Sequence, residues 1–220
     1  MIEIGELFYP VGEKHFTRYA DAIDDYGKED REAAYRYVKR WRRALDVGAN
    51  VGIFSRDFAT RFEEVVAFEP MPATRDCLSL NIPPNVRVEP FAIANKPGAL
   101  RMCRTKNTGA AFICNHPKVI TPEFSPDAYK IIKVRVRNID GFHFDAVDLI
   151  KLDIQGAEHL ALLGARETIL RHRPVIMVEE KAFSDAHADA IKMTSKLLRK
   201  SFGMTAKEKV QTDRVYVFED

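Results

Sequence analysis

The stretch LDVGANVGIFS, residues 45–55, decides the fold, because an apolar run ends there in a carboxylate and a glycine turn before a helical pattern begins. Gly48 and Gly52 allow the chain to turn tightly and allow a ligand to approach the backbone closely. Their spacing is G-x-x-x-G, so the G-x-G-x-x-G fingerprint of dinucleotide-binding proteins is absent. Asp46 would repel a pyrophosphate here but attract an ammonium or sulfonium group. The stretch therefore predicts a strand, a ligand-binding turn and a helix; the plainer alternative is a glycine turn with only a structural role.

Beyond this turn, short apolar runs alternate with helical periods along the chain. Strands are predicted over residues 44–47, 65–68, 86–88, 147–152, 174–178 and 214–218, and helices over 51–62, 73–80, 157–170 and 186–199. The apolar runs 91–94 and 99–103 flank the turn sequence NKPG, which predicts a hairpin. Alternating strands and helices indicate an α/β fold with a doubly wound, mostly parallel sheet and one antiparallel strand near an edge.

Ligands of such sheets bind outside the carboxyl ends of the strands, so the residues that follow each strand are the candidates for function. Glu69 ends the second predicted strand, where a carboxylate can accept hydrogen bonds from both hydroxyls of a ribose. On its own Glu69 would be an ordinary surface residue, but it follows the turn that holds Asp46. A turn suited to a sulfonium group and a ribose-binding acid together indicate that the chain binds S-adenosylmethionine.

A later strand leads into a second group of polar residues, again at a junction between a strand and a helix. Asp153, Gln155 and Glu158 lie there, beside the predicted cofactor turn, and form a candidate site for group transfer. The alternative is helix capping, in which Asp153 or Gln155 caps the next helix and Glu158 interacts with its dipole. Both roles can coexist. One of Glu179 and Glu180, which end the next strand, is expected to face the same cleft.

Composition and charge limit the classes of function. The chain has 220 residues, with 34 lysines and arginines against 32 aspartates and glutamates, and a net charge of +2. This balance does not favour nucleic acid or a membrane as a partner. Cys77, Cys103 and Cys114 include no C-x-x-C pair, so we expect free thiols rather than a disulfide framework or a zinc site. No signal peptide or membrane-spanning run is visible, so we expect a cytoplasmic protein.

Two segments do not follow the α/β pattern. Residues 1–43 hold an irregular start and a charged helical stretch, KEDREAAYRYVKRWRR, in which Ala34, Val38 and Trp41 lie at helical spacing. We expect residues 1–43 to form an N-terminal extension whose helix packs on the main domain. Residues 105–130 contain several prolines and are expected to form a long ordered loop, and such loops often bind ligands.

Four motifs, in this order, resemble the FkbM-type family of S-adenosylmethionine-dependent methyltransferases: LDVGANVGIFS, VVAFEP, VDLIKLDIQGAEHLALLGA and RPVIMVEE. The resemblance covers residues 44–181, and DRVYVF near the C-terminus is similar to the family's closing strand. It implies a class I, Rossmann-like methyltransferase fold with a seven-stranded sheet, with residues 44–220 as the methyltransferase domain. The resemblance carries cofactor binding onto Asp46, Gly48, Asn50, Gly52 and Glu69, and the active centre onto Asp153, Gly156 and Glu158.

The sequence departs from the family at one position. The family pattern is D-x-E-G-x-E, and this chain has Gln155 in place of the first glutamate. An amide cannot act as a base or supply a strong charge to a metal ion, so we expect no metal in the site. The histidines show no metal-ligand spacing either. His159, which adjoins Glu158, is a candidate auxiliary base, whereas His116 and His143 lie in predicted loops.

The resemblance implies methyl transfer to a hydroxyl group of a sugar or small metabolite. A hydroxyl is a weak nucleophile and benefits from a nearby base; Asp153 is the first candidate, followed by Glu158 and His159. The expected partner is a small-molecule or saccharide acceptor, without nucleic acid or membrane. A nucleic-acid methyltransferase is one alternative, although it should show a D/N-P-P-Y/F motif where this chain has DIQG. The second alternative is a non-catalytic protein that keeps the cofactor-binding fold.

Overall fold

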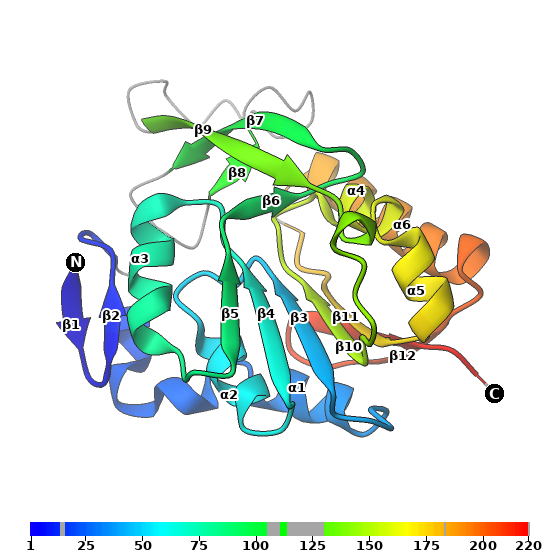
Figure 1. Cartoon of the computed structure of the whole chain (residues 1–220), viewed down its shortest axis with the longest axis horizontal. Coiled ribbons are helices and arrows are strands. Elements are labelled where there is room, and N and C mark those ends of the chain that lie inside the picture. Colours follow the sequence, from blue (N-terminus) through cyan, green and yellow to red (C-terminus); the bar gives the residue numbers. More distant parts are fainter. Residues whose placement is uncertain (14–15, 105–110, 114–129, 183, 220) are drawn as a thin grey trace.

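A seven-stranded sheet runs through the middle of the molecule (Figure 1) in the computed structural model, which describes residues 1–13, 16–104, 111–113, 130–182 and 184–219. The strand order is β12–β13–β11–β10–β3–β4–β5. The bounds are β3 Arg43–Val47, β4 Glu64–Phe68, β5 Val86–Glu89, β10 Leu149–Leu152, β11 Val175–Glu179, β12 Thr205–Lys209 and β13 Asp213–Val217. β13 is antiparallel to both neighbours, and the pairs from β11 to β5 are parallel. The predicted sheet, mostly parallel with one antiparallel strand near an edge, is confirmed.

Helices cover both faces of this sheet, because alternate residues of each strand point to opposite sides. The helices are α1 Lys28–Tyr35, α2 Ile53–Ala59, α3 Pro72–Asn81, α4 Glu158–Leu163, α5 Arg166–His172 and α6 Asp185–Lys196. Leu45 and Val66 share one buried layer with residues of α4 and α5. Ala44 and Val65 share the other buried layer with residues of α1, α2 and α3. The central strands β3, β4, β10 and β11 are therefore buried on both faces, which is why their sequences are mostly apolar.

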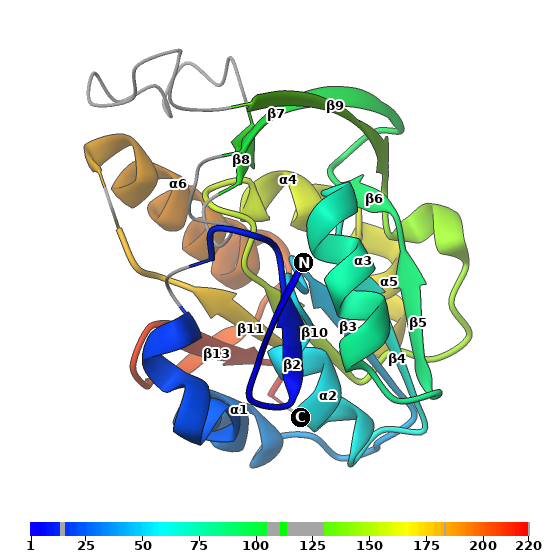
Figure 2. The same cartoon turned by 90° about the vertical axis from the view of Figure 1, so that its left-hand side faces the viewer.

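A second, four-stranded sheet lies at the carboxyl end of the main sheet (Figures 1 and 2). Its order is β6–β9–β7–β8, with bounds β6 Phe91–Ile93, β7 Gly98–Arg104, β8 Phe112–Ile113 and β9 Lys130–Arg137. The predicted hairpin between residues 91–94 and 99–103 is wrong. β9 pairs with β6 in parallel and with β7 antiparallel, so it lies between them. Of the predicted loop 105–130, residue 111, residues 112–113 of β8 and residue 130 of β9 are described; the rest lies outside the described residues.

The N-terminal segments pack against α3 and the helical layer beside it. β1 (Ile2–Ile4) and β2 (Leu7–Tyr9) form a hairpin, which is followed by the 3-10 helix η1 (Phe16–Asp25). The Asn81 side chain accepts a hydrogen bond from the Phe8 N–H (2.7 Å) and donates to the carbonyls of Phe8 (2.9 Å) and Val51 (2.8 Å). One amide therefore ties the hairpin both to α3 and to the turn that follows β3.

Helix lengths differ from the predictions at three places. The charged stretch is helical only as far as Tyr35, although Ala34 and Val38 are buried as expected. The helix predicted over 157–170 divides into α4 and α5 at Gly164, where a Cβ would lie 2.3 Å from the carbonyl oxygen of Ala94. The last helix, predicted to end at residue 199, leaves regular α geometry after Lys196 and continues as a wider turn through Ser201.

The cysteines only partly follow the prediction. Cys77 is a buried thiol outside any disulfide, as expected, but Cys103 is disulfide-bonded, so the expectation that all three cysteines are thiols is wrong. Within the described part of the chain, every helix is too short or too polar to cross a membrane.

Candidate active site

The turn after β3 lies where the strand order reverses, between β3 and β10. Gly48 and Gly52 both have positive φ angles, of 87° and 96°. A Cβ on Gly48 would lie 2.0 Å from the carbonyl oxygen of Asp153, so only glycine lets the turns after β3 and β10 meet this closely. Asn50 also has a positive φ, and its buried side-chain oxygen Oδ1 has no hydrogen-bond partner among the described residues. The turn therefore presents an acceptor that the described part of the chain leaves unused.

Glu69 lies beside this turn, as predicted. Its side chain is buried, Oε2 accepts a hydrogen bond from the Asn50 N–H (3.1 Å), and Oε1 accepts one from the Met71 N–H (2.8 Å). Burial raises the pKa of Glu69 to about 7, although these two hydrogen bonds favour the ionised form. Each carboxylate oxygen keeps a second lone pair, so Glu69 can accept further hydrogen bonds from a ligand.

Lys151 on β10 joins the two candidate motifs, and the sequence argument did not single it out. Its Nζ lies 3.3 Å from Asp46 Oδ1 and 3.5 Å from Asp153 Oδ2, and it donates to the carbonyl of Gly48 (3.2 Å). Asp46 is fully buried and also accepts a hydrogen bond from Ser55 Oγ (2.6 Å). Burial works to lower the pKa of Lys151, but the carboxylates of Asp46 and Asp153 outweigh it and raise that pKa. A buried ammonium therefore already balances the charge of Asp46.

Asp153 follows β10, and the amide of Gln155 holds it. Gln155 Nε2 donates to Asp153 Oδ1 (3.0 Å) and to Glu179 Oε2 (3.2 Å). Burial, followed by the negative charge of Asp153, raises the pKa of Glu179 to about 9, so Glu179 is protonated at neutral pH. Glu180 instead accepts hydrogen bonds from Arg214 and Tyr216. The expectation that one of the two glutamates faces Asp153 is therefore met by Glu179.

Glu158 closes the turn between β10 and α4. Its Oε1 accepts hydrogen bonds from the N–H groups of Ile154 (2.9 Å) and Gly156 (3.2 Å), and its side chain is 2% exposed. Among the described residues, no side chain caps α4, so the alternative in which Asp153 or Gln155 caps this helix does not apply. His159 follows Glu158 on α4 and is half-buried. Basic roles for Glu158 and His159 stay predictions.

Three further titratable residues surround Asp153, and none of them was among the candidate site residues predicted from the sequence. Burial and then Asp153 raise the pKa of Tyr26, which follows η1. Burial, then the charges of Asp153 and Asp30, raise the pKa of Asp213 on β13 to about 7. His187 on α6 packs over the turn, since a Cβ on Gly156 would lie 3.4 Å from its ring, and burial lowers its pKa. Of these three residues, only Asp213 could have been identified from the sequence, because it is an acid at the start of an apolar strand.

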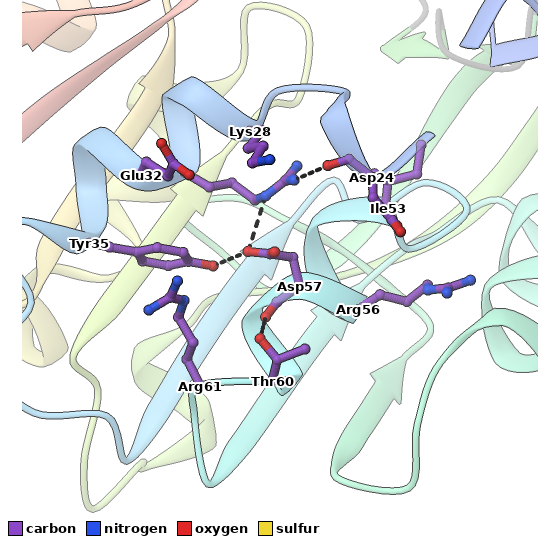
Figure 3. Close-up of a pocket in the computed structure, with 10 residues that line it drawn as sticks. Asp24, Lys28, Glu32, Tyr35, Ile53, Arg56, Asp57, Thr60 and Arg61 are labelled. Carbon is purple, nitrogen blue, oxygen red and sulfur yellow. Dashed lines mark hydrogen bonds and ion pairs between the residues drawn. The ribbon is translucent and has the colours of Figure 1, made fainter. Parts of the chain in front are cut away.

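A charged hollow of 370 Å³ lies elsewhere, over α1 and α2 (Figure 3). The Arg31 side chain is buried there; its Nε lies 3.1 Å from Asp57 Oδ2, and its other nitrogens donate to the carbonyls of Asp24 and Tyr26. Tyr35 also donates to Asp57. The charged groups at the centre of this hollow therefore bind one another, and the hollow is distinct from the site at the carboxyl ends of the strands.

Comparison with known proteins relates this geometry to a family. The family model described as "Methyltransferase FkbM domain" matches residues 46–203. The comparison with curated proteins gives no match. Among solved structures, methyltransferase FkbM from Methylobacillus flagellatus is 18% identical, with a TM-score of 0.53, over 92% of this chain and 60% of that one. The N-methyltransferase NodS from Bradyrhizobium japonicum is 10% identical, with a TM-score of 0.47, over 89% of this chain and 99% of that one.

The structural similarity concerns the fold, and this chain spans 60% of the length of the Methylobacillus protein. The family match rests on the sequence itself, covers more than two thirds of the chain, and includes the turn after β3, Glu69 and the segment from Asp153 to Glu158. The resemblance noted in the sequence is thereby confirmed, and the chain belongs to the FkbM methyltransferase domain family.

Proposed function

We propose that the chain transfers a methyl group from S-adenosylmethionine to a hydroxyl group of a saccharide or small metabolite, with Asp153 as the base. The observation that carries this proposal is the position of Asp153. Its carboxylate follows β10, touches the buried ammonium of Lys151, and lies beside the turn that follows β3. About a third of its side chain is exposed, at 34%, so an acceptor can reach it.

The polar atoms of the site suit the proposed cofactor. Asn50 Oδ1 has no partner in the part of the chain that the structure describes, and both oxygens of Glu69 can accept further hydrogen bonds. These acceptors match the donors of S-adenosylmethionine, which are an ammonium group and two ribose hydroxyls. We therefore propose that Asp46, Gly48, Asn50, Gly52 and Glu69 hold the cofactor. When bound, the cofactor supplies a methyl group on a positively charged sulfur.

The chain's own residues would orient the acceptor and move one proton. Asp153 would accept the proton of the acceptor hydroxyl as its oxygen takes up the methyl group, whose bond to the cofactor's sulfur breaks, and would later release that proton to water. Lys151 Nζ lies 3.5 Å from one oxygen of the Asp153 carboxylate, and Gln155 donates to the other and fixes the direction of the carboxylate. Glu158 and His159 remain candidates behind Asp153. Alignment of the nucleophile with the methyl group supplies the rest of the acceleration.

We also propose that residues 1–43 form an extension that shapes the acceptor side of the methyltransferase domain, residues 44–220. The support comes from Tyr26, whose pKa responds to Asp153, Lys151 and Glu179. The Tyr26 ring also contacts Phe54 of α2, at 6.5 Å between ring centroids. A segment that precedes the family match therefore contributes a side chain to the neighbourhood of the proposed base.

Replacing Glu69 with alanine should weaken binding of S-adenosylmethionine by about ten- to a hundredfold, because a buried, charged hydrogen-bond acceptor is lost. Isothermal calorimetry measures this effect directly. The exposed neighbour Glu63, replaced with alanine, is the control and should bind like the wild type. Affinity of the Glu69 variant equal to that of the control would remove Glu69 from the ribose site.

The same titrations at several pH values test how Glu69 binds. Its pKa is about 7 in the ligand-free protein, and ribose hydroxyls donate to the ionised carboxylate. Protons therefore compete with the ligand, and wild-type affinity should fall as the pH drops below 7, by at most about tenfold per pH unit. The Glu69→Ala variant should lose this pH dependence. An equal slope in both proteins would assign the dependence to another group.

Methyl transfer should survive exhaustive chelation with EDTA. The reason is that Gln155 supplies an amide where a carboxylate would complete a set of oxygen ligands with Asp153 and Glu179. The Gln155→Glu variant restores that carboxylate and is the matched comparison; it should respond to magnesium or calcium where the wild type does not. Loss of wild-type turnover in EDTA, restored by either ion, would contradict the prediction.

A further inference from the structure

The outer face of the small sheet carries charge of one sign. β6, β7 and β9 hold six lysines and arginines and no acidic residue. Arg101 of β7 lies directly opposite Lys133 of β9, and Arg135 follows two residues later on the same face. All three side chains are exposed, whereas Val134 and Val136, which point the other way, are buried. The cations therefore line the face that is turned away from the protein.

This charge is not neutralised by the rest of the described structure. None of the ion pairs between described residues includes Arg101, Lys133 or Arg135; Arg135 instead stacks over the ring of Phe91, at 4.5 Å from its centroid. Like charges directly across a sheet destabilise the pair, and Arg101 opposite Lys133 is such a case. Mixed signs are usual on a soluble surface, and the chain as a whole is nearly neutral. A local excess of this kind attracts anions.

We propose that this cationic face, defined by Arg101, Lys133 and Arg135, binds an anionic polysaccharide. The charge is complementary, and Lys133 and Arg135 are two residues apart on one strand, about 7 Å, which suits a polymer with closely spaced charges. RNA fits less well, because sheets that bind single strands stack the bases on exposed aromatic rings, and here Arg135 covers Phe91. An anionic membrane fits less well too, because Ile131 is the large apolar side chain exposed among the described residues of these strands.

The experiment measures binding of polygalacturonate, an acidic polysaccharide, without any cofactor, so its outcome does not depend on methyl transfer. The wild type should bind polygalacturonate, and binding should weaken as salt is added. Lys133→Glu/Arg135→Glu should weaken it by about 10- to 100-fold, since two attractions become repulsions. The control Arg199→Glu/Lys200→Glu changes the net charge equally at two exposed residues near the end of α6 and should bind like the wild type.

Two comparison ligands decide between partner classes. Neutral dextran should not bind, and a single-stranded RNA homopolymer and phosphatidylserine vesicles should bind more weakly than polygalacturonate. The proposal is overturned by equal weakening in the two double variants, or by tighter binding of the RNA or the vesicles. Circular dichroism of each variant shows that the fold is kept, which is expected because all four substituted side chains are exposed.

Discussion

Replacing Asp153 with asparagine should lower kcat by about 10²–10⁴ and leave the affinity for S-adenosylmethionine nearly unchanged. Asparagine keeps the size of the side chain and can still accept a hydrogen bond, but it cannot take the proton from an acceptor hydroxyl. Cofactor affinity should change little, because Asp46, Asn50 and Glu69 are the proposed anchors. Turnover and calorimetric affinity, measured on one preparation, separate the two effects.

Glu179→Gln is the matched control for this experiment. Glu179 shares the amide of Gln155 with Asp153, but its pKa of about 9 makes it a neutral carboxylic acid at pH 7. Glutamine is also neutral, so this variant should keep kcat within a few-fold of the wild type. If Asp153→Asn retained near-normal kcat, the base assignment would fail and Glu158 and His159 would become the candidates. A large loss in Glu179→Gln alone would move the proton acceptor to that residue.

The main sheet could be predicted because its signals are local. A parallel strand buried on both faces is a short apolar run, and residues 44–47, 65–68 and 174–178 are such runs. The turn after β3 was visible for the same reason: Gly48 needs a positive φ and leaves no room for a Cβ, so its identity is dictated by its own backbone. A structural feature that depends only on a short stretch of sequence can be predicted from that stretch alone.

The small sheet depends on contacts distant in sequence, and there the prediction failed. The turn sequence NKPG between β6 and β7 suggested that these strands pair with each other. β9, some 30 residues further on, pairs with both and separates them. Its sequence, KIIKVRVR, largely alternates apolar and charged residues. This pattern is compatible with any exposed strand and does not indicate which strand it pairs with. Sheet register is decided by such distant pairings, and local patterns leave it open.

The candidate site also combines residues that can be predicted from local sequence with residues that cannot. Asp46 lies near the end of β3, Glu69 and Asp153 directly follow β4 and β10, and all three were found from these positions. Tyr26, which follows η1, and His187 of α6 reach the site, and nothing in their local sequence distinguishes them from other aromatic or histidine residues. Lys151 is different, because a lysine inside the apolar run VDLIKL is a signal: a buried ammonium needs a buried carboxylate.

Lys151→Met should lower the free energy of unfolding by about 3–5 kcal/mol, the usual cost of removing one partner of a buried ion pair. Methionine fits the space of the lysine stem, so the loss comes mainly from the charge of Asp46. That carboxylate is fully buried and would keep one hydrogen bond, from Ser55. Urea denaturation followed by circular dichroism measures the change. Lys192→Met, at a lysine whose side chain is 77% exposed, is the control and should cost less than about 0.5 kcal/mol.

A second substitution distinguishes an unpaired charge from a packing defect. Asp46→Asn/Lys151→Met removes both charges, and asparagine can still accept the hydrogen bond from Ser55. If an uncompensated carboxylate is the cause, the double variant should be more stable than Lys151→Met by about 1–3 kcal/mol. If methionine simply fits badly, the second substitution should add to the loss instead. A cost for Lys151→Met as small as that of Lys192→Met would mean that the ammonium does not hold the turns after β3 and β10 together. In that case the position of Asp153 beside the turn after β3 would have to rest on the close backbone packing at Gly48 alone.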